Sequence, residues 1–168
     1  MKVKEVMSAH SVKFCTPETN LIEAVKSMKE GNCGALPVVN QEYKVLGIVT
    51  YRDICLTLAE PKTQPWEQRK VGDIMTKNVQ TVSSEDEVST AIQNLRKNQI
   101  GRLPVVDSKG KLSGIVSLHN LIDLSVNQGK KELWEIKSQG ESLLKTVRAV
   151  TGRYSVDSPT SPSNFVGE

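Results

Sequence analysis

An internal repeat dominates this sequence. Residues 12–54 align with residues 79–121 at a constant offset of 67 positions, the distance from Gly47 to Gly114, and twelve aligned positions are identical. When the offset is increased by one residue, the match extends upstream, where Val3–Met7 aligns with Val71–Met75. Because each copy of a repeat is expected to form the same structural unit, a motif in one copy is interpreted together with its counterpart in the other. A unit of about 55 residues has a marginal core on its own, so we expect the two copies to pack against each other.

The hydrophobic pattern changes period in the same order in both copies. Short strands are predicted over 12–15 and 79–82, followed by polar residues at 16–18 and 83–85 that can start a helix. Buried strands at 36–39 and 103–106 precede strands at 45–49 and 112–116, and a last helix covers 51–59 and 118–126. Helical spacing between the first two strands places these residues in the core: Leu21, Ala24, Val25 and Met28, then Val88, Ala91, Ile92 and Leu95. We therefore predict an α+β fold of two β-α-β-β-α units packed sheet to sheet with pseudo-two-fold symmetry.

The chain divides into five segments. Residues 1–60 and 71–127 are the two repeats, and residues 61–70 are a polar, proline-containing linker, in which Trp66 is expected to cover a shared edge. An amphipathic helix is predicted over 128–152, and residues 153–168 are expected to be a flexible tail. The helix either packs on another helix or a second chain, or folds back on its own domain. Its apolar stripe comprises Leu133, Trp134, Ile136, Gly140, Leu143, Leu144, Val147 and Val150.

Composition excludes several classes of function. The net charge is only +3 and aromatic residues make up 4%, which argues against a nucleic-acid-binding surface. The longest apolar runs are strand-sized, so we expect no membrane span. The start of the chain lacks the apolar core of a secretion signal. Three cysteines without C-x-x-C spacing, Cys15, Cys33 and Cys55, are expected to be small buried hydrophobes in a cytoplasmic protein.

One stretch in each repeat has two interpretations. Gly47–Asp53 and Gly114–Asn120 each read as a strand that ends in a hydroxyl residue and opens a helix. Unpaired backbone N–H groups and a hydroxyl at a helix start can hold a phosphate. The spacing from Thr50 to Asp53 equally matches a capping box, in which the two side chains only cap the helix. The stretch alone leaves both interpretations open.

Taken together, these features resemble the CBS domain, named after cystathionine beta-synthase, and the tandem resembles the CBS pair called a Bateman module. The resemblance covers about residues 3–126. It rests on Val-x-x-(Val/Ile)-Met, on Gly-(Ala/Arg)-Leu-Pro-Val-Val and on Gly-Ile-Val-(Thr/Ser)-x-x-(Asp/Asn), in that order in each copy. It implies a regulatory module that binds an adenosyl ligand (AMP, ADP, ATP, S-adenosylmethionine or NAD), requires no cofactor, forms a homodimer and signals to a protein partner, for which the C-terminal helix is a candidate.

The resemblance also implies two clefts between the repeats. The first would combine Thr50 and Asp53 with Thr76, Gln80, Ile100, Gly101 and Arg102; the second would combine Ser117 and Asn120 with Ser8, Lys13, Cys33, Gly34 and Ala35. A carboxylate accepts hydrogen bonds from two ribose hydroxyls, whereas the Asn120 amide offers one uncharged acceptor. We therefore expect the first cleft to bind better.

Neither catalysis nor metal binding is predicted. The sequence has no Gly-rich phosphate loop and no recognisable pairing of nucleophile and base. His119 and Asp123 are one helical turn apart, but two side chains do not make a metal site. The alternative to a ligand-binding module is a structural or interaction module without a ligand, which dimerises through the repeats or the C-terminal helix.

Overall fold

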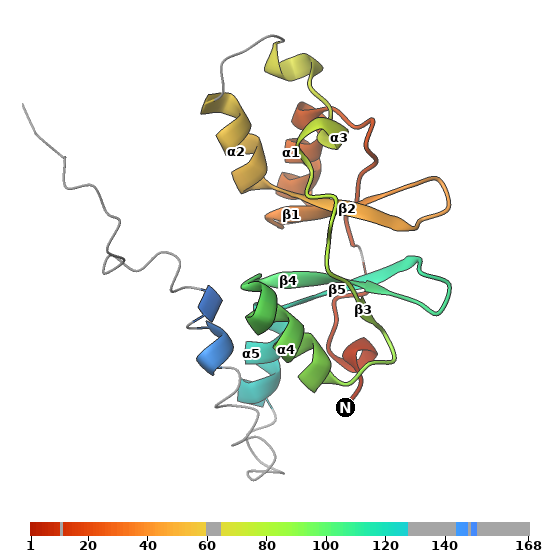
Figure 1. Cartoon of the computed structure of the whole chain (residues 1–168), viewed down its shortest axis with the longest axis vertical. Coiled ribbons are helices and arrows are strands. Elements are labelled where there is room, and N and C mark those ends of the chain that lie inside the picture. Colours follow the sequence, from red (N-terminus) through yellow and green to blue (C-terminus); the bar gives the residue numbers. More distant parts are fainter. Residues whose placement is uncertain (11, 60–64, 128–143, 148, 151–168) are drawn as a thin grey trace, which may run out of the picture.

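The computed structural model describes residues 1–10, 12–59, 65–127, 144–147 and 149–150 (Figure 1). Short 3-10 helices lie at η1 (Val3–Glu5) and η2 (Trp66–Gln68). The first repeat contains α1 (Leu21–Glu30), β1 (Ala35–Val39), β2 (Val45–Thr50) and α2 (Tyr51–Ala59). The chain continues through α3 (Val71–Ile74), β3 (Val82–Ser83), α4 (Val88–Asn98), β4 (Arg102–Val106), β5 (Leu112–Ser117) and α5 (Leu118–Asn127).

The two sheets have the same internal register. β1 pairs antiparallel with β2 so that Ala35 faces Thr50, and β4 pairs with β5 so that Arg102 faces Ser117. Each hairpin carries a bulge at the equivalent place, before Val39 and before Val106. The sheets face each other, and the helices lie on their outer sides (Figure 1). This arrangement confirms the predicted α+β fold of two packed repeats.

The first strand of each repeat is shorter than predicted. In the second repeat only Val82–Ser83 pairs, parallel to β4, and in the first repeat the strand is reduced to one bridge between Cys15 and Val38. The helices also begin later than predicted, at Leu21 and Val88. Residues 16–19 and 83–86 form hydrogen-bonded turns first, and Asn20 caps α1 by accepting from the Glu23 N–H at 2.8 Å.

The repeats exchange their leading segments, by which we mean residues 1–8 and 69–76. Val3 is completely buried in the core of the second repeat, and Val71 is completely buried in the core of the first. Equivalent backbone bonds hold them: the Val3 N–H donates to the Asp86 carbonyl, and the Val71 N–H donates to the Thr19 carbonyl. In Figure 1 the N-terminus accordingly lies beside the second repeat. The core of each repeat therefore includes residues from the leading segment of the other repeat.

Most predicted core positions are buried, with two exceptions. The stripe of α4 is buried at Val88, Ala91, Ile92 and Leu95, but Val25 of α1 is 43% exposed, so the buried stripe of that helix is narrower than its sequence suggests. Cys15 is buried and Cys33 is half-buried, whereas Cys55 is exposed on α2 and is not the buried hydrophobe that we expected.

The linker and the C-terminal region are described in part. Trp66 packs against the core of the first repeat, and its predicted place over an edge shared by the two repeats stays a prediction. Residues 144–147 and 149–150 are helical, and the rest of the predicted 128–152 helix, like the predicted tail over 153–168, lies outside the described residues. Within the described part of the chain, no helix is long and apolar enough to cross a membrane.

Candidate ligand-binding cleft

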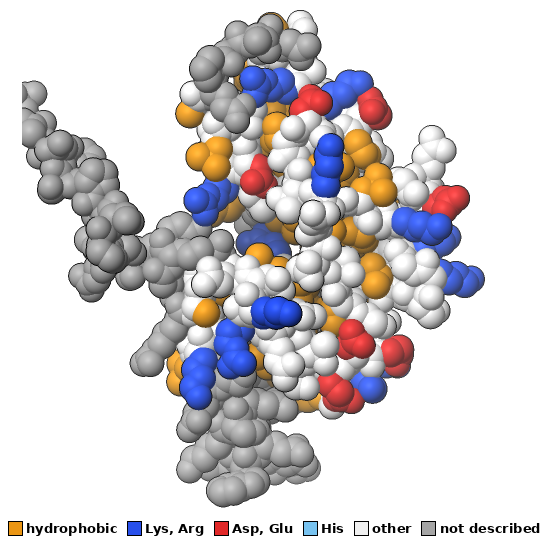
Figure 2. Space-filling model, in the orientation of Figure 1, with side chains coloured by type: hydrophobic (Ala, Val, Ile, Leu, Met, Phe, Trp, Pro, Cys, Tyr) orange, Lys and Arg blue, Asp and Glu red, His pale blue; other side chains and the backbone are white. Residues whose placement is uncertain are grey.

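A cleft of about 720 Å³ lies between the two repeats, and all the residues assigned to the first cleft line it. Figure 2 shows a hollow between the two halves of the molecule, with basic side-chain atoms in it. The walls come from both repeats and from Val150, which follows the second repeat. The lining consists of Gly34, Ile48, Thr50, Tyr51, Arg52, Asp53, Leu56, Thr76, Asn78, Val79, Gln80, Asn98, Ile100, Gly101, Arg102 and Val150.

Thr50 and Asp53 form a capping box at the start of α2. Oδ2 of Asp53 accepts from both the N–H and the hydroxyl of Thr50, each at 2.8 Å, and the Asp53 N–H donates to Thr50 Oγ1 at 3.3 Å. These bonds pair donors that a helix start would otherwise leave unpaired. Among the described residues, no donor is bonded to the other carboxylate oxygen, Oδ1. Asp53 is partly exposed in the cleft, so Oδ1 remains an acceptor for a ligand.

The leading segment of the second repeat brings Thr76 to the same place. The Thr76 N–H donates to the Ile48 carbonyl at 2.9 Å, and the Ile48 N–H donates to the Thr76 carbonyl at 3.1 Å. This close approach requires Gly47, because a Cβ at that position would stand 2.6 Å from the Thr76 carbonyl oxygen. The glycine of the Gly-Ile-Val stretch thus allows a segment from beyond the linker to cross β2 and reach the cleft.

The second repeat builds the same cap from Ser117 and Asn120. Oδ1 of Asn120 accepts from the Ser117 N–H at 3.0 Å and from the Ser117 hydroxyl at 2.6 Å. Its Nδ2 donates to the Ser8 hydroxyl at 3.1 Å, so Ser8, Ser117 and Asn120 meet as expected. The single amide oxygen already accepts two hydrogen bonds, and the remaining polar atom of the side chain is a donor. This position therefore differs chemically from Asp53.

The other residues assigned to the second cleft make their described contacts elsewhere. Lys13 Nζ pairs with Glu30, and Cys33 packs against the core of the first repeat. Ala35 is only 1% exposed within β1. Gly34 lines the first cleft, because the antiparallel pairing of β1 with β2 places its carbonyl against the Tyr51 N–H at 3.2 Å. Its place in the second cleft stays a prediction.

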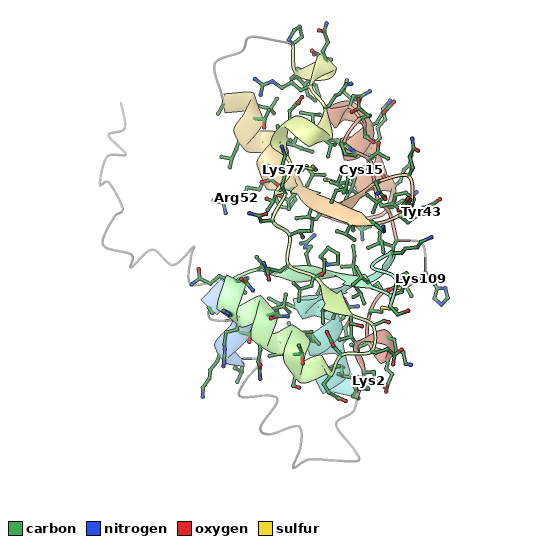
Figure 3. All side chains as sticks on the ribbon, turned by 45° about the vertical axis from the view of Figure 1, so that its right-hand side comes forward. Lys2, Cys15, Tyr43, Arg52, Lys77 and Lys109 are labelled. Atoms are coloured by element: carbon green, nitrogen blue, oxygen red, sulfur yellow. The ribbon has the colours of Figure 1, made fainter. Side chains whose placement is uncertain are left out.

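The first cleft combines charged, polar and apolar side chains. Arg52 and Arg102 supply positive charge, and Asp53 supplies an acceptor. A Cβ on Gly101 would meet nothing within 4 Å, so this glycine borders open space. Figure 3 shows Arg52 near the boundary between the two repeats. Tyr43 and Lys109, at the ends of the hairpins, lie on the opposite side of the molecule. Apolar contact is available from Ile48, Leu56, Val79, Ile100 and Val150.

Our sequence-based assignment missed several of the lining residues. Tyr51 and Arg52 lie within the stretch from Thr50 to Asp53, and Asn78 and Val79 lie between Thr76 and Gln80, so their neighbours in sequence could have indicated them. Three further lining residues lie within three positions of an assigned residue in the sequence: Ile48, Leu56 and Asn98. Val150 follows the second repeat at a distance, and no sequence signal connects it with the cleft.

Two other candidate groups have structural roles. His119 is 83% exposed in its side chain and pairs with Asp123 one turn along α5, at 3.1 Å. Throughout the described residues, His, Cys, Asp and Glu side chains form no group of three or more that could hold a metal ion. Burial raises the pKa of the Cys15 thiol to about 12, so this side chain stays neutral at physiological pH.

Fold and site together define a class: a tandem pair of α+β repeats with a mixed polar and apolar cleft between them. The family model for the CBS domain matches the chain twice, at residues 3–60 and 71–127. The chain therefore belongs to the CBS domain family, and the two matches form a CBS pair.

Comparison with known proteins agrees with this assignment. An uncharacterised 17.7 kDa protein of Acidianus ambivalens is 34% identical over 143 residues, covering 83% of this chain and 84% of that protein. The CBS domain pair of protein MJ0100, solved with 5′-methylthioadenosine and S-adenosyl-L-methionine, superposes with a TM-score of 0.65 at 29% identity, covering 78% of this chain and 98% of that one. CBSX2 of Arabidopsis thaliana, solved with AMP, superposes with a TM-score of 0.67 at 26% identity, covering 77% and 98%.

Proposed function

We propose that this protein is a non-catalytic regulatory module that binds an adenine nucleotide or a related adenosyl ligand in the cleft between its repeats. The observation that carries the proposal is the convergence of Thr50 and Asp53, from one repeat, with Thr76, Gly101 and Arg102 from beyond the linker. Residues more than twenty positions apart line one space, and Oδ1 of Asp53 remains available in it.

The chemistry of the lining suits an adenosyl group. A ribose presents neighbouring hydroxyls to which a carboxylate oxygen can bind, and Asp53 provides that oxygen. Arg52 and Arg102 suit a phosphate or another anionic end of the ligand. The ligands in the MJ0100 and CBSX2 structures, S-adenosyl-L-methionine, 5′-methylthioadenosine and AMP, share an adenosine group, which supports the same class of ligand here.

Signalling would follow from the shared walls of the cleft. A ligand that contacts α2 of the first repeat and residues 100–102 of the second favours the relative placement of the repeats that suits it best. Occupancy then changes how the repeats pack and how the module meets a partner, provided that the ligand binds the two arrangements with different affinity.

Titration calorimetry with AMP, ADP, ATP, S-adenosylmethionine, 5′-methylthioadenosine and NAD tests the proposal. We expect one or more of these compounds to bind, and inosine monophosphate serves as the control for recognition of the adenine amino group. Absence of heat with every adenosyl compound, together with no increase in melting temperature, would remove the proposal.

A structural module without a ligand is the second candidate, and the capping geometry favours it. The Thr50 hydroxyl donates to Asp53, so it must turn away before it can donate to a phosphate. If capping is the whole role of this pair, Thr50→Ala and Asp53→Ala lower the melting temperature by the cost of a lost cap, about 1 kcal/mol. They would then leave the affinity for every compound in the panel unchanged.

We also propose that the module forms a homodimer. Leu58 on α2 is 46% exposed and Ile122 on α5 is 40% exposed, and both helices lie on outer faces of the repeats. Exposed apolar side chains of this kind are suited to contacts between subunits. Light scattering coupled to size-exclusion chromatography should give twice the monomer mass, and a monomer mass at micromolar concentrations would contradict the proposal.

A further inference from the structure

The cleft has a wall that belongs to neither repeat. Val150 lines it together with residues of both repeats. This residue lies in a helical part of the chain, residues 144–147 and 149–150, which we call the C-terminal segment. Figure 1 shows this segment in blue beside the helices of the second repeat.

The C-terminal segment has an inner and an outer side. Thr146 is completely buried, whereas Leu144 is 64% exposed. The two described parts of the segment each turn a residue inward, because Thr146 is completely buried and Val150 lines the cleft.

We propose that the C-terminal segment is part of the adenosyl-binding site, with Val150 contacting the bound ligand, so that ligand binding and docking of the segment stabilise each other. The inference rests on the proposed function. Val150 adds apolar surface to the repeat-derived residues Ile100, Val79 and Leu56, the kind of surface on which a flat base packs. Because coupling between two binding events is reciprocal, a ligand that touches Val150 also strengthens the docking of the C-terminal segment.

The test uses the full chain and AMP as the probe. Val150→Ala should weaken AMP binding roughly 10- to 20-fold in titration calorimetry, the loss expected for two buried methyl groups. Leu144→Ala is the matched control, because it makes an aliphatic truncation in the same segment at an exposed position, and it should leave the affinity unchanged. Melting curves without AMP show whether either variant alters the fold itself.

Hydrogen exchange supplies a second measurement that does not depend on a substitution. In the unaltered protein, AMP should slow exchange of the amides in residues 144–150, and the slowing should be smaller in Val150→Ala. If AMP binds both variants as tightly as the unaltered chain and exchange in the segment does not respond, the inference is wrong while the proposed function stands. If AMP does not bind but another compound of the calorimetry panel does, that compound replaces AMP in both measurements; if no compound binds the unaltered chain, the proposed function and this inference are both wrong.

Discussion

Asp53 and Asn120 occupy equivalent positions in the two repeats and make equivalent capping bonds with Thr50 and Ser117. Their second polar atoms differ. Oδ1 of Asp53 is an acceptor in the cleft, whereas Nδ2 of Asn120 is a donor that binds Ser8. A single atom thus separates a candidate ligand site from a structural contact between the leading segment and α5.

This pair suggests a substitution that separates capping from binding. Asp53→Asn keeps an oxygen that can cap α2, as Asn120 does, but replaces the free acceptor with a donor. We expect AMP affinity to fall by about 1–3 kcal/mol, roughly 5- to 150-fold, because a hydrogen bond to a charged group is lost. The melting temperature should change little, as measured by circular dichroism.

The matched control is Asp86→Asn. Asp86 Oδ2 accepts from the Ser83 N–H at 2.9 Å and does not line the cleft, so the same chemical change there should leave AMP affinity intact. Equal loss of affinity in both variants would mean that net charge, and not the ribose contact, sets the binding.

Gly101 provides a second prediction at the residue scale. A Cβ there meets nothing within 4 Å, so Gly101→Ala should not change the melting temperature of the unliganded protein. The added methyl group would occupy space at the cleft, and we expect AMP to bind several-fold more weakly because overpacking costs about 1 kcal/mol or more. Titration calorimetry with AMP on the unaltered protein and on Gly101→Ala measures this loss of affinity. An unchanged affinity would place the ligand away from Gly101.

The raised pKa of the buried Cys15 thiol makes the stability of the protein depend on pH. Burial raises the pKa of its thiol from 9.0 to about 12, so between these values the folded chain keeps a proton that the unfolded chain releases. Stability therefore falls as the pH rises through this range. Urea unfolding at pH 8 and pH 10 should show that the unaltered protein loses about 1 kcal/mol more than Cys15→Ala. An equal loss in the two proteins would contradict the prediction.

At the scale of elements, the crossing of β2 by the leading segment depends on a glycine. Gly47→Ala would place a Cβ 2.6 Å from the Thr76 carbonyl oxygen, a backbone atom that cannot move without shifting the segment. We expect a loss of about 1–3 kcal/mol in the free energy of unfolding, measured with urea, together with weaker AMP binding because Thr76 is displaced.

The contrast with Gly101→Ala makes this prediction specific. Both changes add one methyl group to a glycine near the cleft, but only the one at Gly47 meets backbone. If the two variants unfold at the same urea concentration, the close approach of residue 76 to β2 does not limit stability.

At the scale of the whole molecule, the exchanged leading segments make the two repeats depend on each other. Each core contains a completely buried valine from the opposite leading segment, Val3 in one and Val71 in the other. Neither repeat keeps its full core if the other unfolds. The molecule is therefore expected to unfold as one cooperative unit although its sequence is a tandem repeat.

Calorimetry tests this cooperativity. The calorimetric and van't Hoff enthalpies of unfolding should agree, as they do for a two-state transition. Val71→Ala should lower the free energy of unfolding by about 2–3 kcal/mol and keep a single transition, because the cavity it leaves weakens both repeats together. Two separate transitions in this variant would show that the repeats are independent.

Much of the molecule could be predicted from local pattern. The 3.6-residue spacing of Val88, Ala91, Ile92 and Leu95 identified the buried face of α4, and the alternation of apolar strands with polar turns identified both hairpins. The repeat itself indicated two similar units, and Thr50 with Asp53 could be singled out because their spacing is a local property of a helix start. Local spacing could not decide between capping and ligand binding, since the same atoms serve both.

The tertiary structure decided what depends on contacts between distant residues. Only the folded chain shows that residues 1–8 complete the second repeat, that Gly34 joins the first cleft through strand pairing, and that Val150 reaches the same cleft. Hydrophobic periodicity specifies which face of an element is buried but not which partner buries it. The choice of partner depends on how all the buried faces fit together at once. Packing in the folded chain therefore decides which elements form the walls of the cleft, whereas the sequence decides which side chains those elements carry.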